Sequence, residues 1–122
     1  MDKLKIFYIE DHTTFAHYVI HRLLSAYDVV LAASLAEAEA LWNAQRPFDL
    51  VLLDFHLPDG TGDIWLRRRQ SDGEQVTAIA VSSHAQGNTL LCQAGALEVC
   101  SKMNIVDLPG LVERALGSRS SL

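Results

Sequence analysis

Two short segments of the chain are apolar at every position: I-F-Y-I at residues 6–9 and L-V-L-L at residues 50–53. A strand with one face in solvent alternates apolar and polar side chains, whereas a strand covered on both faces does not. Parallel strands need crossover connections, which lay helices over the faces of the sheet. These two segments therefore predict a parallel sheet buried between two layers of helices.

Apolar runs occur five times along the chain, and a stretch with helical spacing of apolar residues follows each of them. The runs that we predict to be strands are residues 4–9, 29–32, 50–53, 76–81 and 97–100. The predicted helices lie around residues 15–23, 35–42, 60–70, 88–93 and 108–116. Five βα units predict an α/β fold with a doubly wound parallel sheet, whose ligands bind at the carboxyl ends of the strands. We assign residues 1–117 to this domain and residues 118–122 to a tail or the start of a linker.

The composition narrows the class of protein. The chain has 122 residues, of which 49% are hydrophobic, so it has room for one globular domain with a core. No apolar stretch approaches the roughly 20 residues that span a bilayer, and a net charge of −5 gives no general attraction for nucleic acid. Cys92 and Cys100 have neither the spacing of a zinc site nor that of a disulfide framework. We therefore expect a cytoplasmic protein without direct contact to membrane or nucleic acid.

Chemically reactive side chains follow four of the five predicted strands. Glu10 and Asp11 end the first strand, Asp54 the third, Ser82 the fourth and Lys102 the fifth. A single acidic residue after a strand is usually a turn or cap residue, but here all of these groups would meet at one edge of the sheet. Clustered carboxylates repel one another, and a hard cation such as Mg²⁺ relieves that repulsion. The sequence thus predicts a magnesium site with an ammonium and a hydroxyl beside it.

Four segments around these residues resemble one family. They are I-E-D at residues 9–11, L-L-D-F-H-L-P-D-G-T-G at residues 52–62, S-S-H at residues 82–84 and A-G-A-L-E-V-C-S-K at residues 94–102. In this order and spacing they resemble the receiver domain of two-component response regulators. The resemblance implies a flavodoxin-like fold with five parallel strands in the order 2-1-3-4-5 and five helices.

The resemblance also implies a function. Asp54 would accept a phosphoryl group from a phosphohistidine of a sensor histidine kinase or a histidine phosphotransfer protein. Asp11, Asp54 and the backbone carbonyl of His56 would ligate Mg²⁺, and Glu10 would act through water. The domain would promote its own phosphorylation and slow dephosphorylation without being a conventional enzyme. A changed surface would then act on a downstream effector or form a phosphorylation-dependent homodimer.

Further positions match the family or depart from it. Ser82 matches the hydroxyl residue that responds to phosphorylation, and Lys102 matches the lysine that touches the phosphoryl group. Met103 stands where the family often has a proline after a cis peptide bond, so we expect a trans bond here. Val99 replaces the usual tyrosine or phenylalanine, and we therefore expect the loop after Ser82 and the fourth helix to carry the response.

Two histidines are predicted to modulate the lifetime of the phosphorylated state. His56 lies two residues after Asp54, and His84 lies two residues after Ser82. Both should border the approach of the hydrolytic water, and in the resembling family these two positions vary and tune the lifetime. The alternative is that both imidazoles simply face solvent.

Other features have simpler interpretations. His12, His17 and His21 are predicted to lie on the surface or to contact a partner, because no third metal ligand is evident near them. Arg67–Arg69 is interpreted as a complement to a helix dipole. Two other functions stay open: a pseudo-receiver that binds partners without being phosphorylated, and a free-standing phosphatase.

Overall fold

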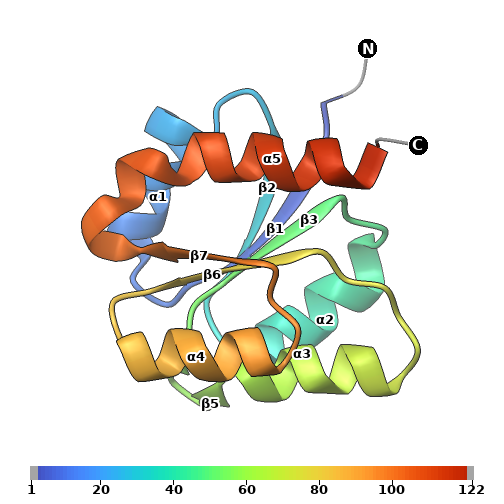
Figure 1. Cartoon of the computed structure of the whole chain (residues 1–122). Coiled ribbons are helices and arrows are strands. Elements are labelled where there is room, and N and C mark those ends of the chain that lie inside the picture. The colour runs from blue at the N-terminus through green and yellow to red at the C-terminus, as the bar shows by residue number, and fades with distance from the viewer. Residues whose placement is uncertain (1–2, 121–122) are drawn as a thin grey trace.

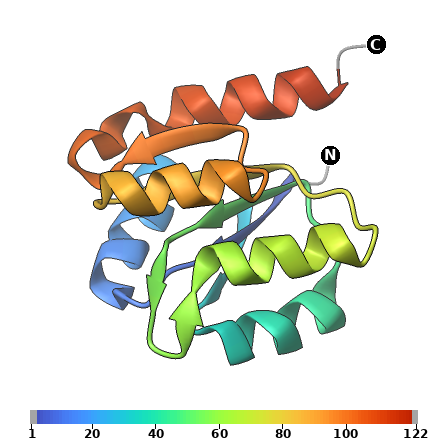
Figure 2. The ribbon, with the colours of Figure 1, turned by 60° about the horizontal axis from the view of Figure 1, so that its bottom comes forward.

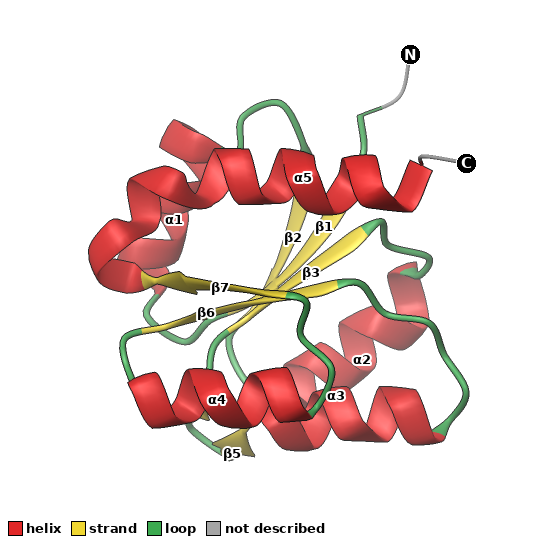
Figure 3. Cartoon of the chain, in the orientation of Figure 1, coloured by secondary structure: helices red, strands yellow, loops and turns green. Residues whose placement is uncertain are grey.

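The computed structural model describes residues 3–120, with side chains up to residue 117. Its centre is a sheet of five parallel strands in the spatial order β2-β1-β3-β6-β7 (Figures 1 and 3). The strands are β1 (Lys5–Ile9), β2 (Asp28–Ala32), β3 (Leu50–Leu53), β6 (Ala78–Ser82) and β7 (Glu98–Ser101). Counted without a small separate hairpin, this is the order 2-1-3-4-5, so the predicted doubly wound, flavodoxin-like fold is confirmed.

Helices cover both faces of the sheet, as the fully apolar strands predicted. On one face lie α1 (Thr13–Leu23) and α5 (Leu108–Ser120); on the other lie α2 (Leu35–Gln45), α3 (Gly62–Ser71) and α4 (Ala85–Gln93) (Figures 1 and 2). Alternate residues of β1 enter the two cores: Ile6 and Tyr8 face α1 and α5, whereas Phe7 and Ile9 face the other helices. None of the helices within residues 3–120 is both long and apolar enough to cross a bilayer.

The predicted helix boundaries were wrong at several ends. Helix α3 begins at Gly62 and not at Gly60, helix α4 begins at Ala85 before the predicted start at residue 88, and α5 continues past residue 116 to Ser120. A six-residue 3₁₀ helix, η1 (Lys102–Asp107), leads into α5. The predicted tail at residues 118–122 is therefore helical up to residue 120, and residues 121 and 122 lie outside the described part of the chain.

A two-stranded hairpin occupies the segment where the third helix was expected to begin. Strands β4 (His56–Leu57) and β5 (Gly60–Thr61) pair antiparallel, with His56 opposite Thr61. Gly60 has φ +150°, and a Cβ there would come within 2.8 Å of the side chain of Leu35. Glycine is thus needed at this position for both its conformation and its size.

The turn of this hairpin is fastened to the start of α2. The carboxylate of Asp59 accepts hydrogen bonds from the backbone N–H groups of Leu35 (2.8 Å) and Ala36 (2.9 Å), and the Ser34 hydroxyl accepts from the N–H of Glu37 (3.1 Å). Three of the unpaired donors in the first turn of α2 are thereby satisfied. The hydrogen bonds from the N–H groups of Leu35 and Ala36 lower the pKa of the Asp59 carboxyl below its ordinary value.

The lowered pKa of Asp59 predicts a pH-dependent contribution to stability. The contribution is fully present above the ordinary carboxyl pKa of about 4 and is lost as the pH falls through the lower folded-state pKa. We expect the stability difference between the parent and Asp59→Asn to shrink between pH 6 and about pH 3. Urea denaturation over this pH range measures it, with Asp107→Asn as an exposed control. A difference that does not change with pH would contradict the prediction.

Candidate functional site

Three carboxylates meet at the carboxyl ends of β1 and β3. Glu10 is completely buried, Asp54 is 4% exposed, and Asp11 is partly exposed. Oxygen atoms of all three, together with an imidazole nitrogen of His12, lie within 4.8 Å of one another. The pairing of β1 with β3 produces this arrangement, since it aligns Ile9 with Leu53 and so places Glu10 and Asp54 side by side. The backbone N–H of Asp54 donates to the carbonyl of Ile9 at 3.0 Å and fixes the junction.

Lys102 reaches this cluster from the end of β7. Its Nζ lies 2.7 Å from Oε1 of Glu10 and 2.9 Å from Oδ2 of Asp54. Burial of the ammonium acts to lower its pKa, but hydrogen bonds to Glu10 and Asp54 outweigh burial, so the pKa of Lys102 is raised. Lys102 is therefore a cation over the whole physiological pH range and faces the Asp54 carboxylate directly.

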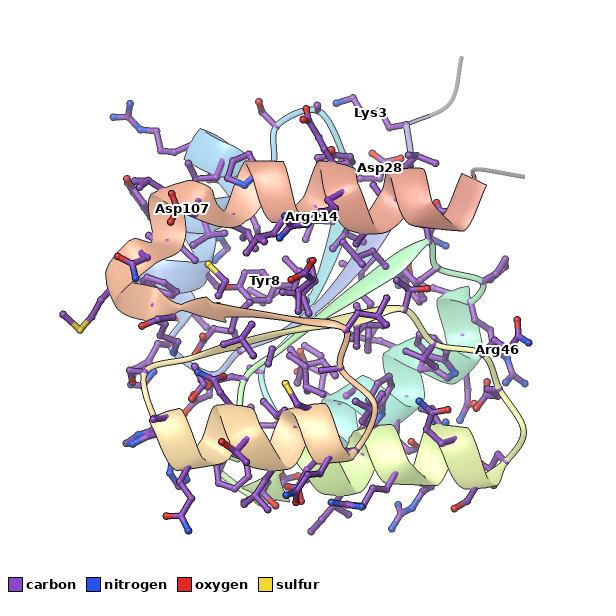
Figure 4. The ribbon with its side chains drawn as sticks, viewed as in Figure 1. Lys3, Tyr8, Asp28, Arg46, Asp107 and Arg114 are labelled. Atoms are coloured by element: carbon purple, nitrogen blue, oxygen red, sulfur yellow. The ribbon has the colours of Figure 1, made fainter. Side chains whose placement is uncertain are left out.

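Burial has the opposite consequence for Glu10. Removal from water raises the pKa of Glu10, more than the hydrogen bond from Lys102 lowers it. Burial, followed by the charge of Glu10, also raises the pKa of Tyr8, whose ring lies between the sheet and α5 (Figure 4). Burial at the floor of the site therefore disfavours negative charge, so an added positive charge is favoured there.

The donor set suits a divalent cation. Three carboxylates and one ammonium leave a formal charge of −2. Oδ1 of Asp11 is shielded from solvent and has no hydrogen-bond partner within the described residues. A hard divalent ion would satisfy this oxygen and offset the remaining charge. The predicted ligand residues Asp11 and Asp54 are brought together, while the carbonyl of His56, in β4, stays a prediction.

Ser82 ends β6 at the same edge of the sheet and is fully buried. Its hydroxyl accepts a hydrogen bond from the N–H of His84 (3.1 Å), and its backbone carbonyl accepts one from Nδ2 of Asn88 (3.2 Å). The hydroxyl is therefore engaged with its own loop in this structure, and the carbonyl is tied to α4.

The two histidines predicted to modulate the site are in contact. The rings of His56 and His84 meet edge to face with centroids 4.5 Å apart. Both line a cavity of about 580 Å³ whose wall includes Phe55 and Leu90. The structure thus brings the loop after β3 and the loop after β6 together through this ring pair.

Phe55, next to Asp54, packs against the first turns of α4. A Cβ at position 87 would lie 2.7 Å from the ring of Phe55, so Gly87 is what allows the ring to approach the helix. The N–H of Phe55 also donates to Oδ1 of Asp54 at 2.7 Å. Phe55 therefore connects Asp54, the predicted phosphoryl acceptor, with α4.

The two departures from the family lie at the end of β7. Val99 is 40% exposed and lines a shallow depression with residues of α4, among them Asn88 and Cys92. The peptide bond between Lys102 and Met103 is trans, as expected. Met103 is almost fully exposed, so its side chain does not contribute to the core.

Sequence reasoning missed the ionic partners of two side chains, His12 and Arg69. His12 does not share an environment with His17 and His21, whose rings stack on α1; its Nδ1 lies 3.4 Å from Oε2 of Glu10 and 3.6 Å from Oδ1 of Asp11. Arg69 was interpreted only as a complement to a helix dipole; it lies in the last turn of α3, and its side chain is also 3% exposed and ion-paired. The position of His12 directly after Glu10 and Asp11 in the sequence was the signal that could have shown its closeness to these carboxylates.

Comparison with known proteins identifies the family. The family model described as the response regulator receiver domain matches residues 6–113. The chain belongs to the response regulator receiver domain family. No significant match was found among curated proteins. Solved structures match this receiver domain over nearly their whole length, as the three examples below show.

A CheY-like response regulator receiver domain protein from Methanospirillum hungatei JF-1 superimposes with a TM-score of 0.85 at 24% identity, covering 97% of both chains. The receiver domain of the Francisella response regulator 1452 has a TM-score of 0.84 at 17% identity, covering 96% of this chain and 99% of that one. A LuxR-family two-component response regulator from Aurantimonas has a TM-score of 0.79 at 25% identity, covering 96% and 87%. These likenesses establish the fold of the domain.

Proposed function

We propose that this receiver domain is a signalling switch that accepts a phosphoryl group on Asp54 from a phosphohistidine of a partner protein, in a reaction that requires Mg²⁺. The observation that carries the proposal is the environment of Asp54: a nearly buried carboxylate between the fully buried Glu10 and the ammonium of Lys102. Membership of the receiver family supports it.

The chemistry needs little from the protein beyond position and charge. An oxygen of Asp54 attacks the phosphorus atom, the phosphorus–nitrogen bond of the phosphohistidine breaks, and the electron pair returns to the imidazole. The carboxylate of Asp54 is itself the nucleophile, so the transfer needs no general base to remove a proton. Lys102, already 2.9 Å from Oδ2 of Asp54, is in reach of a phosphoryl oxygen carried by that carboxylate. Asp11, Asp54 and the backbone carbonyl of His56 would hold Mg²⁺, with Glu10 acting through water, and the ion would supply charge neutralisation.

Phosphorylation would change the loops around Asp54. A phosphoryl group is a strong acceptor for the O–H of Ser82 and would draw this hydroxyl toward Asp54, and the Ser82 oxygen in this structure also accepts from the N–H of His84. Because Asn88 holds the carbonyl of Ser82, a shift of this loop is passed to α4. Val99 lies against the same helix, so α4 and β7 are the surface that we expect to change.

The partners follow from the chemistry. The donor is a sensor histidine kinase or a histidine phosphotransfer protein, and the changed surface acts on an effector or pairs with a second copy. His56 and His84 tune the lifetime of the phosphorylated state. Cys92 and Cys100 are free thiols, which fits a reducing cytoplasm.

Incubation with acetyl phosphate and Mg²⁺, followed by intact-mass measurement, tests the proposal. We expect the chain to gain the mass of one phosphoryl group and to lose it again over minutes or longer. EDTA should prevent the gain. No gain in the presence of Mg²⁺ would support the pseudo-receiver function instead, and turnover of acetyl phosphate without accumulation would support the phosphatase.

A further inference from the structure

His12 introduces a nitrogen atom at the edge of the carboxylate cluster. It precedes α1 directly, and its side chain makes no hydrogen bond that caps the helix. Its backbone N–H instead donates to Oε2 of Glu10 at 3.1 Å, which holds the residue beside the buried carboxylate. Its Nδ1 faces both Glu10 and Asp11, and this group of four residues is the candidate metal cluster of the described chain.

The distances are close to those between ligands of one metal ion. Nδ1 of His12 lies 3.4 Å from Oε2 of Glu10 and 3.6 Å from Oδ1 of Asp11. Two neighbouring ligand atoms of an octahedral ion with bonds of about 2.1 Å lie about 3.0 Å apart. The ring of His12 is 73% exposed, so it has room for the small rotation that closes the difference.

The cluster also has an open side. His12, Phe15, Tyr18 and Lys102 line a hollow of about 510 Å³ at the surface between α1 and the loop after β6. Solvent and ions therefore reach the cluster from the side on which His12 stands. The oxygen Oδ1 of Asp11 is shielded from solvent, has no hydrogen-bond partner within the described residues, and lies 3.6 Å from Nδ1 of His12.

We propose that His12 is a direct ligand of the cation site, so that this receiver domain prefers first-row transition ions over Mg²⁺ more strongly than its carboxylates alone would. Imidazole nitrogen suits ions such as Co²⁺, whereas Mg²⁺ prefers oxygen ligands. This inference rests on the cation site of the proposed function, but not on phosphorylation itself. Its consequence is that the loaded metal depends on which ions the cell supplies.

Direct metal binding to the full chain tests the proposal without any activity measurement. Binding of Mg²⁺ and of Co²⁺ is measured by calorimetry for the parent, His12→Asn and His17→Asn. For His12→Asn we expect Co²⁺ affinity to fall about tenfold or more, while Mg²⁺ affinity changes less than about twofold. The visible absorption spectrum of bound Co²⁺ should shift as a nitrogen ligand is replaced.

The control variant His17→Asn tests whether a second Co²⁺ site on α1 accounts for the binding. His17 and His21 stack on α1 and could hold Co²⁺ by themselves. His17→Asn disrupts that pair and should leave both the affinity and the spectrum unchanged, and excess Mg²⁺ should displace Co²⁺ from the parent. Equal Co²⁺ affinity and spectra in the parent and His12→Asn would overturn the role of His12 and leave the proposed function standing. Failure of the parent to bind either ion would overturn both.

Discussion

Replacing Asp54 with asparagine abolishes the phosphoryl gain from acetyl phosphate and Mg²⁺. Asparagine keeps the size of the side chain but replaces the attacking oxygen anion with an uncharged amide. It also removes the carboxylate that faces Lys102 at 2.9 Å, so both the nucleophile and one partner of the ammonium are lost. Intact-mass measurement after a fixed incubation records the effect, and we expect no detectable labelled species.

A matched control lies nearby in the chain. Asp59 is in the turn of the β4–β5 hairpin that follows Asp54, but it is exposed and its carboxylate caps α2. Asp59→Asn should be labelled as rapidly as the parent. Labelling of Asp54→Asn at the rate of the parent would place the acceptor elsewhere and refute the assignment of Asp54.

Replacing Arg69 with alanine should lower the free energy of unfolding by about 3 kcal/mol. The guanidinium is 3% exposed, stacks on Trp65 with its centre 5.5 Å from the ring, and pairs with Glu39 at 3.1 Å and Glu74 at 3.5 Å. Truncation leaves a hole, removes the cation that pairs with Glu39, and leaves Glu74 with Arg46 as its cation. We place the effect near the low end of buried ion pairs, because Glu39 and Glu74 keep some solvent.

Glu74 extends this network beyond Arg69. Its Oε1 accepts hydrogen bonds from Nε1 of Trp42 and from Arg46, whose side chain lies at the far end of α2 (Figure 4). The network therefore joins α2, α3 and the loop before β6, so its loss should affect global unfolding.

Urea denaturation followed by tryptophan fluorescence tests the Arg69 prediction. Arg68→Ala, on the exposed side of the same helix, should change stability by less than about 0.5 kcal/mol. Arg69→Met, which restores apolar volume without a charge, should recover part of the loss. If Arg69→Ala and Arg68→Ala are equally stable, the network contributes nothing to folding.

The sheet and the acid cluster could be predicted because their signals are local in the sequence. An apolar run such as residues 50–53 needs no knowledge of its neighbours to be read as a buried strand. The carboxyl ends of parallel strands meet at one edge, so Glu10 and Asp54 were expected to be near each other before any distance was known. Strand order came from the family resemblance, and the structure agrees with it.

What could not be predicted depends on contacts between distant segments. The burial of Arg69 results from Glu39 on α2 and Glu74 in a loop, and a run of three arginines contains no sign of either. Asp59 looks like a turn residue in the sequence, yet its hydrogen bonds go to residues 35 and 36. The hairpin β4–β5 consists of two-residue strands, which are too short to produce a periodic pattern.

The first turns of α4 hold two strand ends at once. Gly87 receives the ring of Phe55, which follows β3, and its neighbour Asn88 holds the carbonyl of Ser82, which ends β6. Helix α4 is therefore held at two points, by Phe55 next to the acceptor and by the end of β6. A side chain at position 87 would push the helix away from Phe55, while the hydrogen bond from Asn88 to Ser82 would remain. Helix α4 would then tilt instead of shifting as a whole. With a larger residue at position 87, the orientation of α4 would no longer depend on whether Asp54 is phosphorylated.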